Sequence, residues 1–111
     1  MRYIIYGAGG VGATIGGRLF HNGLDTILIC RGDHLTAIQE RGLHLVTHDL
    51  GAIDLPITAV GHPSEINWSE DDVVILSMKT QDTEGALLDL EAAAGDVQPP
   101  IICAQNGVEN E

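Results

Sequence analysis

The chain has 111 residues, enough for one compact domain that buries a core without disulfides or metals. Hydrophobic residues make up 44% of it and aromatic residues only 4%, a balance typical of the aliphatic core of a buried parallel sheet. Its formal net charge of -11 argues against a general role in binding nucleic acid or anionic membranes, so any bound phosphate must be held by local amides and cations.

The first residues predict a strand, a turn and a helix. Arg2 to Tyr6 is a short β-branched and aromatic run, too short for a signal peptide, and Gly7 closes it. Apolar residues then recur at helical spacing from Val11 to Leu19, before the stop signal His21-Asn22-Gly23. No stretch approaches the roughly 18 apolar residues that cross a bilayer, and we expect a cytoplasmic protein.

The second predicted strand is the apolar run from Thr26 to Cys30. Asp33 is expected to cap a helix that ends near Arg41, where Gly42 breaks it. Two residues of this helix are expected to face the core, Leu35 and Ile38. Apolar and polar residues alternate over residues 43–60, which predicts a hairpin or an edge ribbon.

Residues 62–68 are expected to form a loop before a fully apolar strand from Val73 to Leu76. A helix is then predicted from Thr80 to Ala94, ended by Gly95, and a fifth strand from Ile101 to Ala104. One apolar face of the helix is expected to point inward, formed by Ala86, Leu87, Leu90 and Ala94.

Alternating strands and helices predict an α/β fold of the Rossmann type, a doubly wound and mostly parallel sheet that forms a single domain over residues 1–111. In the expected strand order two strands separate Cys30 from Cys103, which at about 4.8 Å per strand places them roughly 14 Å apart, beyond disulfide reach. Both cysteines are expected to be reduced thiols of the core.

The glycine turn after the first strand carries the clearest chemical signal. Gly7, Gly9 and Gly12 fit the pattern G-x-G-x-x-G, with a predicted strand before it and a helix after it. These glycines permit a tight turn, a close approach of backbone to pyrophosphate, and close packing of helix on strand. The alternative is a merely flexible loop, and no Gly-Lys-Ser/Thr follows to indicate a P-loop. We predict that a dinucleotide diphosphate is bound by Gly7, Ala8, Gly9, Gly10, Val11 and Gly12.

Arg31, Lys79 and Asn106 each follow a predicted strand at the sheet edge where α/β ligands bind. Arg31 stands where NAD-specific domains carry an acidic residue, and its guanidinium suits a 2′-phosphate, so we predict NADP(H) over NAD(H). Lys79 is the only lysine, and Asn106 is placed to hydrogen-bond the nicotinamide ribose or a substrate oxygen. The plainer alternatives are a loop arginine, a solvated lysine and a turn asparagine.

His44 and His48 share a predicted strand face, but no carboxylate or thiol completes a metal-ligand set at convincing spacing. We expect solvent-facing histidines and no metal.

Four segments together resemble the amino-terminal domain of the ketopantoate reductase family: Ile4 to Gly12, Cys30-Arg31-Gly32, Ser77 to Gln81, and Gln105 to Glu109. The likeness runs through essentially the whole chain, and Lys-Thr-Gln and Gln-Asn-Gly-Val are its more specific motifs. It implies an NADPH-dependent oxidoreductase that reduces a 2-keto acid, 2-dehydropantoate, to pantoate on the route to pantothenate and coenzyme A.

The resemblance also implies residue roles. Arg31 would bind the 2′-phosphate, Lys79 and Gln81 would lie near the adenosine and ribose moieties, and Asn106 would sit beside nicotinamide and substrate; Lys79 and Asn106 are the candidate catalytic residues. In the family, the general-acid lysine comes from a C-terminal helical domain, which we expect to be absent from these 111 residues. The isolated chain is therefore expected to bind NADPH with little or no reductase activity.

Two other functions stay open at this point. One is a non-catalytic NAD(P)-sensing regulatory Rossmann module, although such modules usually carry an acidic residue where Arg31 stands. The other is an interaction module that has kept the fold and lost its ligand, against which the retained glycines argue. A homodimer is one alternative for the oligomeric state.

Overall fold

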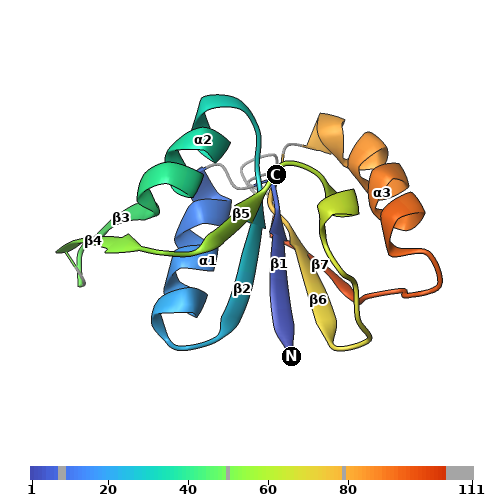
Figure 1. Ribbon diagram of the computed structural model, residues 1–111, viewed down its shortest axis with the longest axis horizontal. Helices are drawn as coiled ribbons and strands as arrows, with labels where there is room; N and C mark the ends of the chain where they lie inside the picture. The colour runs from blue at the N-terminus through green and yellow to red at the C-terminus, as the bar shows by residue number, and fades with distance from the viewer. Residues whose placement is uncertain (8–9, 50, 79, 105–111) are drawn as a thin grey trace, which may run out of the picture.

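A computed structural model describes residues 1–7, 10–49, 51–78 and 80–104, with residues 10, 11 and 80–82 described by their backbone only. Within this part of the chain a parallel sheet has the strand order β5-β2-β1-β6-β7 (Figure 1). Its strands are β1 (Arg2–Tyr6), β2 (Asp25–Ile29), β5 (Thr58–Val60), β6 (Asp72–Leu76) and β7 (Ile101–Cys103). This order confirms the predicted Rossmann-type α/β fold.

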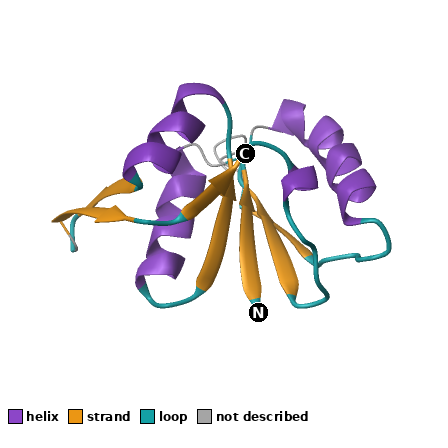
Figure 2. Ribbon diagram, in the orientation of Figure 1, coloured by secondary structure: helices purple, strands orange, loops and turns teal. Residues whose placement is uncertain are grey.

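Helices cover both faces of the sheet (Figure 2). On one face lie α1 (Gly10–His21) and α2 (Gly32–Arg41), and on the other lies α3 (Thr80–Ala94). α1 connects the parallel neighbours β1 and β2, and α3 connects the parallel neighbours β6 and β7, as expected for crossover helices. The predicted bounds of α3 match the observed ones. None of the described helices combines the length and apolar character that a membrane crossing requires.

The sheet has one cluster of buried apolar side chains on each face, because side chains along a strand alternate between the two faces. Successive residues of a strand point to opposite faces, so Ile5 packs toward α1 and α2 while Ile4 packs toward α3. Both side chains are fully buried, as is Val74 of the adjoining strand β6. A strand buried on both faces requires a continuous apolar run, which is the feature that predicted β1, β2 and β6 from sequence.

Residues 43–60 contain the hairpin that was one of the two structures predicted from their alternation. An antiparallel hairpin is formed by β3 (Leu43–Thr47) and β4 (Gly51–Leu55), and β5 then joins the main sheet as an edge strand. The hairpin projects beside α1 (Figure 1) and packs on it at Gly17, where a Cβ atom would lie 3.0 Å from a methyl carbon of Leu45. The glycine lets the hairpin approach the helix closely.

Three details differ from the sequence predictions. The N-cap of α2 is Arg31 rather than Asp33, because the chain enters the helix at Gly32, whose φ of +63° is left-handed; Asp33 lies in the first turn. Leu87 is 37% exposed, since it lies beside the line of Ala86, Leu90 and Ala94 that faces the sheet. Cys103 is an exposed thiol rather than a core residue, because β7 is an edge strand whose three residues are all exposed.

The loop predicted over residues 62–68 contains a short 3-10 helix, η1 (Pro63–Glu65), which packs against α3. Cys30 directly follows β2, and Cys103 lies in β7. As predicted, two strands, β1 and β6, lie between β2 and β7, and both cysteines are free thiols. Cys30 is buried.

Candidate functional site

The glycine turn lies at the carboxyl end of the central strand, between β2 and β6. The backbone N–H of Gly7 donates to the carbonyl of Ile29 at 3.0 Å, which ties the start of the turn to β2. Gly7 has a φ of +88°, a left-handed conformation that other residues rarely adopt, and α1 begins at Gly10. This is the position in doubly wound folds where strand order reverses and ligands bind.

The start of α1 is electrostatically suited to an anion. The first N–H groups of an α-helix have no partner within the helix, and the helix dipole adds partial positive charge there. No acidic residue occupies the first turn of α1, whereas the first turn of α2 contains Asp33. Of these two helix ends, the one beside the glycine turn is left without an internal counter-charge.

The turn is packed too closely to accept side chains. A Cβ atom on Gly7 would lie 2.7 Å from the Cβ of Met78, and one on Gly12 would lie 2.9 Å from the carbonyl oxygen of Gly7. Real Cβ atoms essentially never approach other atoms this closely. The structure thus explains two of the three glycines in the motif, and Ala8 and Gly9 lie outside the described residues.

Arg31 lies at the same edge, two residues after β2 and at the N-cap of α2. Its side chain is exposed and does not cap the helix, and it takes part in none of the ion pairs formed among the described residues. The guanidinium therefore remains available to an anionic ligand at the position predicted from sequence.

Sequence reasoning did not identify Tyr6, Asp89 and His62 as neighbours of this edge. Burial raises the pKa of the Tyr6 phenol, the Asp89 carboxylate adds to the increase and Arg31 opposes it, so the phenol lies within electrostatic range of both charges. The Nε2 atom of His62 lies 3.7 Å from Asp89, and its Nδ1 atom accepts a hydrogen bond from the backbone N–H of Ser64 at 3.0 Å. These side chains come from β1, α3 and the segment after β5, and no local pattern joins them.

Ser77 is a second residue that sequence reasoning left without a role. Its hydroxyl donates to the carbonyl oxygen of Gly7 at 2.7 Å and lies 3.2 Å from that of Tyr6. Its backbone N–H also donates to Tyr6, at 2.9 Å. The end of β6 is therefore bonded directly to the start of the glycine turn.

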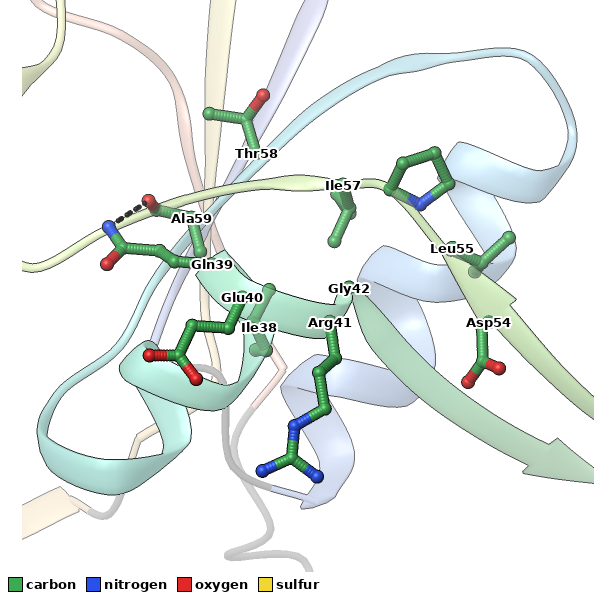
Figure 3. Close-up of a pocket in the computed structure, with 11 residues that line it drawn as sticks. Ile38, Gln39, Glu40, Arg41, Gly42, Asp54, Leu55, Ile57, Thr58 and Ala59 are labelled. Atoms are coloured by element: carbon green, nitrogen blue, oxygen red, sulfur yellow. Dashed lines mark hydrogen bonds between the residues drawn. The ribbon is translucent and has the colours of Figure 1, made fainter.

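A separate pocket of about 560 Å³ lies at the other end of α2 (Figure 3). It is formed by the last residues of α2, by the connection from β4 to β5, including Pro56, and by the start of β5, including Thr58. Gln39 reaches across from the helix, and its side-chain amide donates to the carbonyl of Ala59 at 3.0 Å (Figure 3). The pocket adjoins the amino-terminal end of β5, so it is not part of the glycine-turn site.

His44 lies on β3 with an exposed side chain, as predicted, and its Nδ1 atom lies 2.8 Å from the carboxylate of Asp54 on β4. His48 is also exposed and lies in the turn after β3 rather than on the strand. In the part of the chain that the structure describes, no three His, Cys, Asp or Glu side chains gather as metal ligands would.

A family model described as "Ketopantoate reductase PanE/ApbA" matches residues 3–111. The chain belongs to this ketopantoate reductase family. The match spans the glycine turn, Arg31 and Ser77, and thus every described residue of the site.

Relatives agree with this assignment. A 2-dehydropantoate 2-reductase of Pyrococcus horikoshii is 35% identical over 111 residues, which are 100% of this chain and 35% of that protein. The crystal structure of a PanE/ApbA family ketopantoate reductase from Ralstonia eutropha matches with a TM-score of 0.85 and 34% identity, covering 99% of this chain and 36% of the other. A structure of D-mandelate dehydrogenase with NADH and anilino(oxo)acetate matches with a TM-score of 0.79 and 27% identity, covering 97% and 34% of the two chains.

The chain spans about a third of the length of the ketopantoate reductases that it matches. Three residues to which the family resemblance assigned roles remain untested, because Lys79, Asn106 and the side chain of Gln81 lie outside the described part of the structure. Arg31 is described, and the glycine turn is described at its two ends.

Proposed function

We propose that the chain is the NADP(H)-binding part of a 2-keto acid reductase, with 2-dehydropantoate as its substrate. The observation that carries the proposal is the glycine turn: Gly7 is left-handed at the end of the central strand, and α1, which begins at Gly10, has no acidic residue in its first turn. A pyrophosphate would rest against the backbone amides there, from Gly7 to Gly12.

The choice of NADP(H) rests on Arg31. A planar guanidinium forms paired hydrogen bonds with a phosphate, and the exposed Arg31 side chain lies at the edge where the adenosine ribose would bind. A D-mandelate dehydrogenase that this chain matches was solved with NADH, so the fold alone does not select NADP(H). The preference of this chain is therefore assigned from its own arginine.

The choice of substrate rests on the relatives named 2-dehydropantoate 2-reductase. The names of both this enzyme and D-mandelate dehydrogenase describe the interconversion of a 2-keto acid and a 2-hydroxy acid. This reaction class is therefore supported more broadly than the individual substrate. When bound, NADPH supplies the hydride. The residues of this chain would bind and orient the cofactor, with Lys79, Gln81 and Asn106 completing the site.

A fluorescence titration of the chain with NADPH and NADH tests the proposal. We expect NADPH to bind about tenfold or more tightly than NADH, a difference that one charge-assisted pair of hydrogen bonds supplies. Equal affinities would contradict the assignment of NADP(H), and binding of neither would contradict the cofactor function. We also expect little turnover of 2-dehydropantoate by these 111 residues alone, so robust turnover would contradict a purely cofactor-binding role.

A further inference from the structure

We propose that Ser77 is a positioning residue for the diphosphate, acting through the glycine turn. The inference rests on the proposed function. The Ser77 side chain lies beneath the turn, at the carboxyl end of β6, and contacts the turn at its first and last glycines.

The first contact is the hydrogen bond from the Ser77 hydroxyl to the carbonyl oxygen of Gly7, at 2.7 Å. It holds this carbonyl toward β6. Because Gly7 adopts a left-handed conformation that glycine leaves readily, the peptide plane needs an external constraint to keep one orientation. A carbonyl that turned toward the ligand would present negative charge to a diphosphate.

The second contact is with Gly12, in the first turn of α1. The Ser77 hydroxyl oxygen occupies the space in which a Cβ atom at position 12 would lie. A Cβ atom at position 12 would also lie 3.1 Å from a methyl carbon of Ile5, so this glycine allows α1 to pack closely on β1. The third glycine of the motif has a second role. Its missing side chain leaves space for the Ser77 hydroxyl, which bonds the carbonyl oxygen of Gly7.

These contacts connect the two segments that border the diphosphate position. A serine in this place joins the β1 turn to the segment after β6, which leads into α3. Alanine would keep the backbone hydrogen bond from residue 77 to Tyr6 but would lose the hydroxyl bond to Gly7. The expected result is a mobile turn on an otherwise intact sheet.

The test compares two ligands that share the 2′-phosphate but differ in the diphosphate: NADPH and adenosine 2′-monophosphate. For Ser77→Ala we expect the Kd for NADPH to rise about tenfold, the cost of one lost hydrogen bond in a preorganised site, and the Kd for the monophosphate to change less than about twofold. Ser77→Thr retains the hydroxyl and should restore NADPH binding. Ser69→Ala, at an exposed position in the loop before β6, is the matched control and should leave both affinities unchanged.

Thermal unfolding of each variant separates positioning from stability. Equal loss of affinity for both ligands would show a general structural effect and overturn the proposal, as would unchanged NADPH binding in Ser77→Ala. Failure of Ser77→Thr to restore binding while Ser77→Thr remains folded would also overturn it. An unmodified chain that binds neither ligand would instead contradict the proposed function itself.

Discussion

Gly7 and Met78 are in such close contact that a Cβ atom added to Gly7 would lie 2.7 Å from the Cβ of Met78. The turn after the central strand and the segment after β6 are thus packed backbone to backbone. This contact gives Gly7 two reasons to be glycine, its φ of +88° and the absence of space for a side chain.

Gly7→Ala and Gly23→Ala separate these two reasons. Gly23 has a φ of +86° and no atom within 4 Å of its would-be Cβ, so its substitution imposes only the left-handed strain, about 1–2 kcal/mol. Gly7→Ala also overpacks the contact with Met78, which should lower the free energy of unfolding by roughly a further 1–3 kcal/mol. Urea unfolding should show the larger loss of stability for Gly7→Ala, and NADPH titration should show weaker binding for that variant alone. Equal losses of stability would contradict the packing described for the turn.

Arg31→Asp should reverse the cofactor preference. The carboxylate repels a 2′-phosphate and accepts hydrogen bonds from a 2′-hydroxyl, as acidic residues do at this position in NAD-specific folds. We expect NADPH affinity to fall about 100-fold and NADH affinity to remain or rise. Competition titrations of both cofactors measure the change. Arg41→Asp, at the far end of the same helix, is the control. A similar loss of NADPH affinity in Arg41→Asp would contradict a specific role of Arg31 in binding the 2′-phosphate.

Asp72 should matter more to stability than Asp49, although each accepts two hydrogen bonds from one arginine. The Asp72 side chain is fully buried, bonds Arg2 at 2.8 Å twice, and also accepts from the backbone of Ser69. Asp72→Asn leaves a partly buried guanidinium without its charge partner, at a cost of about 2–3 kcal/mol.

The Arg18–Asp49 pair is exposed on both sides and screened by solvent, so Asp49→Asn should cause little change in stability. Arg18 nevertheless holds the pKa of the Asp49 carboxyl well below its ordinary value, chiefly through their hydrogen bonds. Any contribution of this pair is present above pH 4 and declines as pH falls below it. Denaturant unfolding at pH 7 checks the comparison, and equal losses for the two variants would contradict it.

The two thiols should differ in reactivity. Burial raises the pKa of the Cys30 thiol above its ordinary value of 9.0, whereas Cys103 lies exposed on the edge strand. Iodoacetamide at pH 8 should alkylate Cys103 first, by about tenfold or more in rate, because the thiolate is the nucleophile. Peptide mass spectrometry after timed labelling measures both rates. Faster labelling of Cys30 in the folded chain would contradict its burial.

The same shift sets the direction of a pH effect. The folded chain favours the protonated form of Cys30, so this thiol's contribution to stability is complete below pH 9 and is lost as the pH rises through its folded pKa. Cys30→Ala should reduce the alkaline loss of stability, although Tyr6, whose pKa is also raised, adds to the loss above pH 10. An unchanged alkaline profile would exclude this role of Cys30.

Much of the fold could be predicted from sequence because its signals are local. The continuous apolar runs gave β1, β2 and β6, and the turn signals at Gly42 and Gly95 gave the ends of α2 and α3. Errors arose where the outcome depends on distant parts of the chain. Whether Cys103 is buried depends on which strand lies at the edge of the sheet. Whether Leu87 faces inward depends on the rotation of α3 about its own axis as it packs on the sheet.

The site divides in the same way. The glycine motif and Arg31 could be found because their spacing from the strands is fixed. Ser77 could not, since its partner Gly7 lies 70 residues away, and a serine at a strand end is an ordinary residue. Tyr6, Asp89 and His62 likewise meet only in the folded chain.

Binding of a diphosphate by backbone amides at the start of α1 is tested most directly by a nuclear magnetic resonance titration of the isotope-labelled chain with NADPH. We predict that the amide resonances of residues 10–13 and of Arg31 shift together and saturate at one NADPH per chain. Shifts confined to the pocket between α2 and β5, with residues 10–13 unaffected, would contradict it.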